Sequence, residues 1–511
     1  MGAQASRYRL PPTSPNYQLF SISISSSNKI RVIDADLDVV NVIRENLTKN
    51  YGLEGESISS AETLFKLQGH PFRTLSAYEE NLSVRYFFAL LLEELCKKGW
   101  RLCLDSNLKQ SVTGIRSTLF FAKAVPASSE TRIFCLSFSS TNRIQIFNGT
   151  NRAIRALREC VGGKHLNKKE NDSGRIFEIS IQNEYAFGFM YAVGANESPK
   201  LHDAAKVNAL LAELFERFSE CGFKHYGTVN LKGTTDCIFF IKEEIFQSEV
   251  QEKFGIITVN GNDCIRIANF SSRFVDSISR IVHKRWPHKF SERRQCRVKQ
   301  IDCVELKLCD YTAKNKYLMD KEAAATGMTL NSSFLCEVLQ ECLSHGFTLL
   351  TSLDMSRVTQ DSNILVLKDS LPTNNNAVQY FTIGMALSNY ISITGAERIV
   401  QDAIMDLIKE TWSLGLRGSM AKDKECKLVL KGRPWNGKNR YTCLGRFMMS
   451  RVLNDLRCRG CTIVCSADLP WQWVSAQRDS ELWKSHTWIV MRGTGPPSYG
   501  FVQAPPSYET L

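Results

Sequence analysis

The first six residues have the spacing of an acyl-acceptor signal. The chain begins Met1-Gly2-Ala3-Gln4-Ala5-Ser6, which fits the pattern M-G-x-x-x-[ST] for N-myristoylation of Gly2. Removal of Met1 leaves an unhindered glycine amine, and Ser6 completes the motif. We therefore expect Gly2 and Ser6 to form a lipidation site.

Charge near this end is the expected second membrane signal, because one myristoyl chain binds membranes with an association constant of only about 10⁴ M⁻¹. The first 33 residues carry no acidic residue and four basic ones, Arg7, Arg9, Lys29 and Arg31. Each basic residue near anionic lipid adds about 1 kcal/mol. Phosphorylation of the serines between 21 and 27 would oppose this attraction. The alternative interpretations are a solvated leader and an alternating strand over 20–24.

A second basic stretch runs from Lys284 to Lys299 and contains Lys284, Arg285, Lys289, Arg293, Arg294, Arg297 and Lys299. Trp286 and Phe290 lie among these cations, so the stretch could bind acidic lipid or single-stranded nucleic acid. With an acylation signal present, we expect acidic lipid, bound by Lys284, Arg285, Arg293 and Arg294, and we do not expect nucleic acid. The alternative is a solvated linker between two folded units.

The last residues contain the motif PPxY twice. One copy is Pro496, Pro497 and Tyr499, and the other is Pro505, Pro506 and Tyr508. WW domains bind such prolines in the polyproline II conformation on an aromatic groove. Two linked copies favour a tandem partner, for which avidity gains are roughly 10²–10⁴. The final Glu509-Thr510-Leu511 is a weaker candidate ligand for a PDZ domain.

Residues for catalysis or metal binding are not expected in this chain. It contains no P-loop, H-E-x-x-H or G-x-S-x-G motif, and its eight histidines do not cluster. Cys458 and Cys461 have C-x-x-C spacing, but zinc usually requires a second pair of ligands, so we expect a structural role. The sequence therefore predicts no enzyme, no cofactor and no metal.

The elements that carry these motifs form a repeat. A helix, a glycine and an apolar strand recur around Gly99, Gly222, Gly346 and Gly460, at intervals of 123, 124 and 114 residues. Apolar residues at helical spacing precede each glycine, and alternating residues follow it. Glycine suits the position just past a helix end, where φ is often positive. Such regular spacing predicts four copies of one structural unit.

The expected fold class is α+β, with about four tandem β-α-β-β-β-α modules and antiparallel sheets with helices on one face. The last module reads as truncated, which is typical of a terminal capping repeat. Both terminal tails are expected to be disordered. The predicted segments are a leader at 1–30, modules at 31–165, 170–290, 298–415 and 424–492, and a PPSY tail at 493–511.

The composition indicates a globular protein whose positive charge favours anionic partners. Hydrophobic residues make up 43% of the chain, charged residues make up 23%, and the net charge is +12. The 17 scattered cysteines lie largely in apolar stretches, which indicates reduced thiols in the cytosol. No apolar run reaches the ~20 residues of a membrane-spanning helix.

Short resemblances support the same interpretation. The opening Met1–Ser6 resembles myristoylated effectors such as the MARCKS group, and the helix–Gly–aromatic–strand pattern is loosely similar to raftlins, which are N-acylated membrane proteins. This chain has Ala3 where raftlins carry a cysteine. The paired acyl signal and PPxY motif resemble retroviral Gag, but the Gag zinc knuckle and this repeat do not match. PPxY tails, by resemblance, recruit Nedd4-type HECT ubiquitin ligases.

The sequence thus predicts an adaptor held peripherally on the cytoplasmic side of the plasma or endosomal membrane, which docks WW-domain proteins through its two PPSY motifs. The alternative is a non-enzymatic repeat protein of membrane microdomains or trafficking that binds lipid or another ligand.

Overall fold

The structure is a computed structural model that describes residues 18–59, 62–72, 78–108, 117–139, 143–162, 166–170, 176–181, 201–231, 237–242, 252–260, 264–287, 290–308, 321–354, 362–370, 378–386, 388–435, 441–469 and 485–493. Over these residues the chain is a mixed α+β protein with four six-stranded antiparallel sheets. The predicted class and the tandem repeat are confirmed. Most of the predicted leader and nearly all of the predicted tail lie outside the described residues.

Each sheet comes from one module, which contains a hairpin, a helix, a second hairpin, a second helix and a third hairpin. The first module contains β1 (Leu19–Ser26), β2 (Lys29–Ile33), α1 (Leu37–Tyr51), β3 (Leu53–Ile58), β4 (Glu62–Leu67), α2 (Tyr78–Lys97), β5 (Trp100–Asn107) and β6 (Ser117–Lys123). The second contains β7 (Arg132–Ser139), β8 (Arg143–Phe147), α3 (Asn151–Val161), β9 (Leu166–Glu170), β10 (Ile176–Ile181), α5 (Leu201–Glu220), β11 (Lys224–Val229) and β12 (Cys237–Lys242).

The other two modules repeat this order of elements. The third contains β13 (Phe254–Asn260), β14 (Cys264–Ala268), α6 (Ser272–Arg285), β15 (Phe290–Val298), β16 (Ile301–Leu308), α7 (Lys321–Ser344), β17 (Phe347–Asp354) and β18 (Ser362–Asp369). The fourth contains β19 (Gln379–Ala386), β20 (Tyr390–Thr394), α8 (Arg398–Thr411), β21 (Leu416–Lys422), β22 (Glu425–Leu430), α9 (Tyr441–Cys458), β23 (Cys461–Leu469) and β24 (Ser485–Arg492).

The strand order is the same in every sheet. With the strands of a module numbered along the chain, the order is three, four, two, one, six, five. The third hairpin therefore returns to the first strand, and strands three and five form the two edges. In the first module this places β3 at one edge and β5 at the other.

The two helices of a module differ in how much of their surface is buried. The first helix buries one stripe, as Val39, Val40, Ile43 and Leu47 do on α1, which is typical of a helix that covers one face of a sheet. The second helix is buried nearly all round. On α9 the buried residues include Arg446, Phe447, Met448, Met449 and Ser450 in succession. A helix of this kind must have sheets on both sides.

These second helices lie between neighbouring modules. Residues of α2 share one core with strands of the first sheet and with β7, β8 and β12 of the second. In the same way α5 packs against the third sheet and α7 against the fourth. The sheets are therefore covered on both faces, by their own helices and by the second helix of the preceding module, rather than on one face as predicted.

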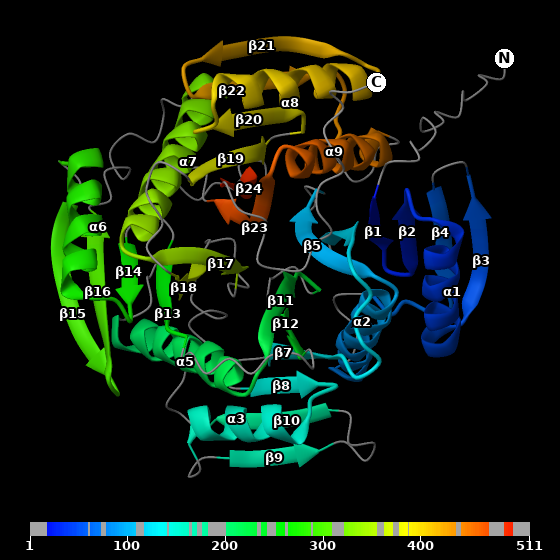
Figure 1. Ribbon diagram of the computed structural model, residues 1–511, viewed down its shortest axis with the longest axis horizontal. Coiled ribbons are helices and arrows are strands. Elements are labelled where there is room, and N and C mark those ends of the chain that lie inside the picture. The colour runs from blue at the N-terminus through cyan, green and yellow to red at the C-terminus, as the bar shows by residue number, and fades with distance from the viewer. Residues whose placement is uncertain are drawn as a thin grey trace.

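The fourth module closes the structure onto the first. Helix α9 lies against β1, and Leu19 and Ile33 share a core cluster with Phe447 and Trp488. Figure 1 shows the four modules arranged as a ring, with β5, β11, β17 and β23 around its centre. These four edge strands contact one another in a closed circuit.

Ring closure changes the predicted module boundaries. The sheets divide the chain at 19–123, 132–242, 254–369 and 379–492, whereas the predicted unit combines a second helix with the first hairpin of the following sheet. Local helix–Gly–strand signals do not show which strands pair. The fourth module has all six strands and is not truncated. The strands that the predicted fourth unit lacked are supplied by β1 and β2 at the start of the chain.

The repeated glycines have the predicted role. Gly99, Gly222, Gly346 and Gly460 have φ values of 78°, 79°, 75° and 73°, in the left-handed region that favours glycine. At Gly99 an added Cβ would lie 2.7 Å from the carbonyl oxygen of Ala124. The glycine therefore ends α2 and lets the backbone pass close to the loop after β6.

Candidate functional site: the module junctions and the ring axis

The lipidation residues Gly2 and Ser6, the basic residues Arg7 and Arg9, and all six PPSY residues lie outside the described residues. Their placement therefore stays a prediction. Within the described residues, no helix is long and apolar enough to cross a membrane.

The basic residues of the predicted leader that the structure describes belong to the first sheet. Lys29 and Arg31 lie on β2, and Arg31 Nε is 2.6 Å from Glu62 Oε1. Ser21 and Ser23 are buried on β1, so a kinase cannot reach them in the folded protein, whereas Ser26 is exposed. The alternating strand over 20–24 is confirmed, and a leader that extends to residue 30 is wrong at its end.

The second basic stretch is not a linker, because it forms the end of α6 and the edge strand β15. Arg293 is 2.7 Å from Asp276, and Arg294 is 2.6 Å from Glu292. Lys284 is exposed, and Arg285 is partly exposed. The ring of Trp286 packs on Phe334, with centroids 4.7 Å apart. Acids therefore accompany these arginines, and this tryptophan is engaged within the protein.

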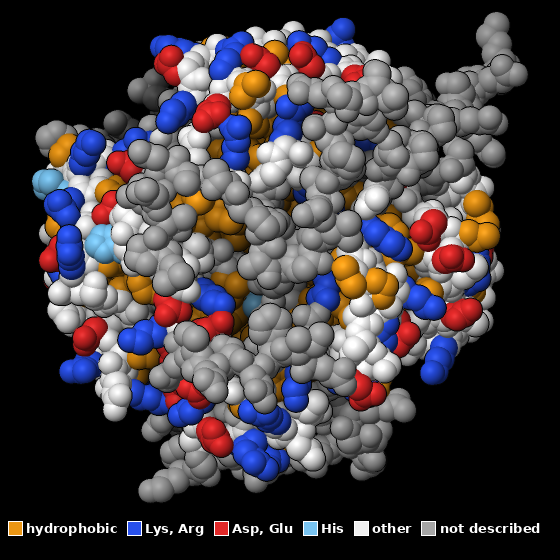
Figure 2. Space-filling model, in the orientation of Figure 1, with side chains coloured by type: hydrophobic (Ala, Val, Ile, Leu, Met, Phe, Trp, Pro, Cys, Tyr) orange, Lys and Arg blue, Asp and Glu red, His pale blue; other side chains and the backbone are white. Residues whose placement is uncertain are grey.

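The surface around this stretch carries charges of both signs. Figure 2 shows Lys and Arg around the rim of the molecule with Asp and Glu among them. Mixed charge of this kind weakens the attraction of a surface for an anionic membrane, because opposite charges a few ångströms apart cancel at a distance. On the face shown, the described side chains form no extended field of one sign.

The two C-x-x-C cysteines lie on either side of the turn between α9 and β23. Cys458 is exposed at the end of α9, and Cys461 is buried at the start of β23. No group of three His, Cys, Asp or Glu side chains that could hold a metal occurs among the described residues. The cysteines of the described segments are free thiols.

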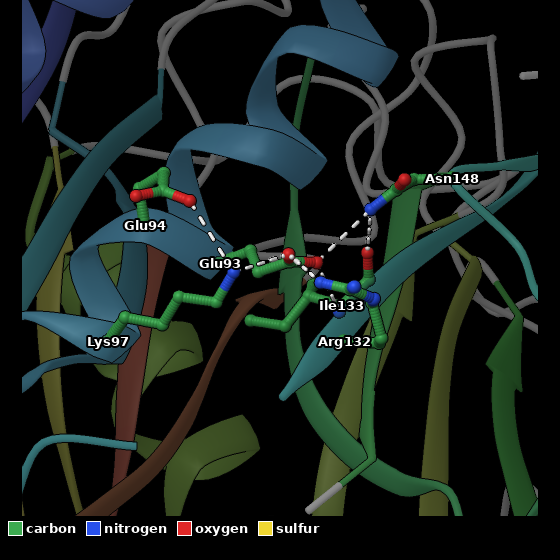
Figure 3. Close-up of polar contacts among 6 residues, drawn as sticks. All are labelled: Glu93, Glu94, Lys97, Arg132, Ile133 and Asn148. Carbon is green, nitrogen blue, oxygen red and sulfur yellow. Dashed lines mark hydrogen bonds and ion pairs between the residues drawn. The ribbon is translucent and has the colours of Figure 1, made fainter. Parts of the chain in front are cut away.

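A buried carboxylate joins the first module to the second. Glu93, on α2, is 5% exposed. Its Oε2 accepts hydrogen bonds from Ile133 N at 3.0 Å and Asn148 Nδ2 at 3.2 Å. Its Oε1 accepts from Lys97 Nζ at 2.9 Å and Arg132 Nη1 at 3.0 Å (Figure 3). One side chain thus accepts from the amide of Ile133, the second residue of β7, and from three side-chain donors.

The asparagine in this contact has an unusual backbone conformation. Asn148 has a φ of 57°, a left-handed conformation that asparagine tolerates better than most residues. Its amide also donates to Ile133 O at 2.8 Å. The turn after β8 is thereby tied both to α2 and to the start of its own sheet. Burial lowers the pKa of Lys97, but the hydrogen bonds and charges of Glu93 and Glu94 outweigh this and raise it.

The same arrangement occurs at the second junction. Glu216 Oε1 accepts from Phe254 N at 3.3 Å and from Asn269 Nδ2 at 3.1 Å. Asn269 has a φ of 65° and donates to Phe254 O at 2.7 Å. Burial raises the pKa of the Glu216 carboxyl. Glu93 and Glu216 each lie six residues before the repeated glycine, a signal in the sequence that motif searches do not use.

The other two junctions have amides at this position. Gln340 Nε2 donates to Val378 O at 3.1 Å, and Asn454 is the corresponding residue of α9. The turn residue is Gly395 at the third junction, with a φ of 90°, and Asp34 at the fourth, with a φ of 61°. Backbone geometry is therefore kept at all four junctions while the charged contact is not.

Polar side chains connect all four modules around the ring axis. Asp105 Oδ2 accepts from Asn230 N at 2.8 Å, and Ser466 Oγ donates to Asp105 O at 2.6 Å. Thr228 Oγ1 is 3.2 Å from Thr351 Oγ1, and Ser352 Oγ donates to Ser466 O. These bonds pass from β5 to β11, β17, β23 and back to β5. No sequence motif marks this circuit, because its residues are common polar types on four distant strands.

The contact between the fourth and first modules includes a histidine. His486 Nε2 is 2.9 Å from Asn107 N and 2.9 Å from Ser106 Oγ, and Trp488 Nε1 donates to Ser106 Oγ at 2.7 Å. Because a backbone N–H can only donate, Nε2 must accept, and the imidazole carries its proton on Nδ1. Ser106 then accepts from Trp488 and donates to His486.

Comparison with known proteins finds a domain family and no individual relative. No curated protein and no solved structure matches the chain. A family model, described only as a domain, matches residues 18–122, 253–368 and 379–491. These matches coincide with the first, third and fourth modules. Because they cover more than half of the sequence, the chain belongs to the family that this domain defines.

Proposed function

We propose that this protein is a membrane-anchored, non-catalytic adaptor on the cytoplasmic face. Myristoylated Gly2 and nearby basic residues would hold it to the inner leaflet. The two PPSY motifs would present it to WW-domain proteins, of which Nedd4-type HECT ligases are the proposed class. The chain would then serve as a ligase substrate, a recruiter or a trafficking factor.

The observation that best supports this proposal is the closure of the ring. Leu19, near the first described residue, and Val490, near the last, lie in the same core cluster. The described part of the chain therefore begins and ends in two adjoining modules. An anchor and a docking motif that leave from adjoining modules would keep a bound partner near the membrane.

The anchor is tested by Gly2→Ala in the full-length protein. We expect membrane fractionation to be lost, because the acyl acceptor is gone and stable anchoring takes two signals. A Ser14→Ala variant, outside the acceptor motif, is the control. Unchanged membrane association of Gly2→Ala would refute the anchor.

The docking motifs are tested by replacing Tyr499 and Tyr508 with alanine together. Capture by a tandem WW-domain protein should fall by one to several orders of magnitude when both sites are lost, and less when one is lost, because linked sites act together. A Tyr508→Phe variant controls for the ring itself. Equal capture of the double variant and the wild type would refute docking through PPSY.

The alternative, a repeat protein that binds lipid through its body, has a separate test. Unacylated protein is mixed with vesicles that contain phosphatidylserine and with neutral vesicles. Binding that depends on charge and is lost in a Lys284→Ala, Arg285→Ala double variant would favour the body as the lipid-binding part. We expect weak binding to both vesicles.

A further inference from the structure

The second helix of every module carries a buried polar residue at the same position, fourteen residues before the repeated glycine. These residues are Arg85, Asn208, Ser332 and Arg446, and each is at most 2% exposed. Each lies on a helix that packs against the sheet of the next module. A buried polar layer therefore recurs at every junction, and its charge can be compared from one junction to the next.

The other layers differ in composition. In the first, Arg85 lies over the Phe147 ring with its Cζ 5.9 Å from the centroid. The third contains the buried hydroxyls of Ser332 and Ser392, with the partly buried Lys427 opposite Ser392 in strand register. In the second, Asn208 Oδ1 accepts from Thr258 Oγ1 at 3.1 Å.

The second layer also contains an ion pair. Arg266, on β14, is bound to Glu305 with two nitrogen–oxygen distances of 2.8 Å. One cation therefore meets one anion, which is the usual condition for a buried charge.

The fourth layer has one cation too many. Arg31, which corresponds to Arg266 in strand register, is paired with Glu62 at 2.6 Å. Arg446 adds a second guanidinium. Burial lowers its pKa to about 10, which leaves it charged at neutral pH. Neither Nε nor Nη1 of Arg446 has a hydrogen-bond partner among the described residues.

Two serine hydroxyls face the same layer. On β1, Phe20 and Ile22 point into the core of the first module, whereas Leu19 packs with residues of α9. By strand alternation Ser21 and Ser23 lie on the α9 side. Both are 1% exposed, and neither Oγ has a hydrogen-bond partner among the described residues.

We propose that a small inorganic oxyanion, of which phosphate is the probe, binds between α9 and the first sheet. Arg446 would donate from one edge of its planar guanidinium, the fork that such groups offer to oxyanions. Ser21 and Ser23 would donate from their hydroxyls, and the anion would balance the layer's excess charge. The site would then tie the last module to the first.

The experiment measures thermal unfolding of the full-length protein against phosphate concentration, with gluconate added to hold ionic strength constant. A ligand that binds the folded state stabilises it by RT ln(1 + [L]/Kd), so the melting temperature should climb with the logarithm of phosphate above Kd. Arg446→Met, which keeps the length but removes the charge, should abolish the climb. Arg451→Met, on the same helix, should keep it.

A second measurement identifies the anion directly. Equilibrium dialysis with radiolabelled phosphate should find one site per chain in the wild type and in Arg451→Met, and none in Arg446→Met. Glycerol 3-phosphate, which has the phosphate of a lipid headgroup with its glycerol attached, should not compete, because Arg446, Ser21 and Ser23 are each at most 2% exposed. Competition by glycerol 3-phosphate would overturn a site restricted to inorganic anions.

Three further results would overturn the proposal. The first is a wild type whose melting temperature does not respond to phosphate, which would mean that water satisfies Arg446. The second is an equal response in Arg446→Met, which would place the anion elsewhere. The third is dialysis that finds no site in the wild type. Should Arg446→Met fail to fold, Arg446→Lys keeps the charge without the fork and is expected to bind phosphate at least tenfold more weakly.

Discussion

His486 Nε2 lies 2.9 Å from the backbone nitrogen of Asn107, a residue 379 positions earlier in the chain. This contact joins the last strand of the fourth module to the edge strand of the first. The fourth and first modules are therefore joined by specific polar contacts as well as by apolar packing. The ring is therefore closed by the same means that hold its other modules together.

Replacing His486 with phenylalanine should destabilise the whole fold. The change leaves Asn107 N and Ser106 Oγ without their buried acceptor, which costs about 1–3 kcal/mol. Urea unfolding followed by circular dichroism measures the loss. His202→Phe, at an exposed position on α5, is the control. Equal free energies of unfolding for both variants would show that the histidine contact contributes nothing.

Removal of the last hairpin should affect the first module as well as the fourth. A chain that ends at Arg459 lacks β23 and β24, so Leu104 and Phe120 of the first module lose part of their shared core. We expect limited proteolysis to cut within residues 100–123, far from the new end. A first module as resistant as in the full chain would mean that the ring is open in solution.

The junction carboxylates should differ in their need for charge. Glu93→Ala removes the acceptor of four donors and should lower the free energy of unfolding by about 1–3 kcal/mol. Glu216→Gln should change it by no more than about 0.5 kcal/mol, as an unstrained polar replacement. Gln340 already occupies the equivalent position. A larger loss in Glu216→Gln than in Glu93→Ala would contradict this reasoning.

The raised pKa of Glu216 predicts a pH dependence. Its carboxyl holds a proton in the folded state at pH values where the unfolded chain has released it, because burial disfavours the charge. The stability that this group contributes is full below 4.5, the ordinary pKa of a glutamate carboxyl, and is lost as pH rises through the raised value. The difference in unfolding free energy between wild type and Glu216→Gln should therefore fall as pH rises. A difference that grows with pH would contradict a raised pKa for Glu216.

Cys296 should be the most reactive thiol on the third sheet. It lies opposite Cys303 on the β15–β16 hairpin, and a hydrogen bond from Cys303 lowers the pKa of Cys296. The same bond, with burial, raises the pKa of Cys303. Iodoacetamide at pH 7.5, followed by peptide mass spectrometry, should label Cys296 first. Cys303→Ala should slow this labelling several-fold, and unchanged labelling would contradict the hydrogen bond.

The sequence predicts local structure well and pairing poorly. Gly99 and its three equivalents mark each helix end, because the left-handed backbone there restricts the residue type. The strand order depends on contacts between β1 and β6, or α9 and β1, whose residues are ordinary apolar types. Periodicity cannot reveal such partners, so the apparent truncation of the fourth module concealed a ring.

The candidate sites likewise fall into those that the sequence shows and those that only the fold brings together. Short linear motifs such as Met1–Ser6 and PPSY are visible because their function needs consecutive residues. Glu93, Asp105 and Arg446 act through residues brought together from distant strands, and nothing in their neighbours marks them. The charge at Arg446 stands out only when the four copies are aligned on their glycines, because the alignment shows that Asn208 and Ser332 occupy the equivalent positions.

Closure also fixes how many modules the protein can have. An open array can gain or lose a unit by duplication or deletion, because each unit contacts only its neighbours. Here the four modules form a closed circuit in which α9, in the fourth module, contacts β1, in the first. A fifth module inserted between the fourth and the first would separate His486 from Asn107. Loss of the second module would remove β11, which contacts both β5 and β17. Copy number in this architecture is therefore set by geometry, and duplication of a single module should not yield a longer functional chain.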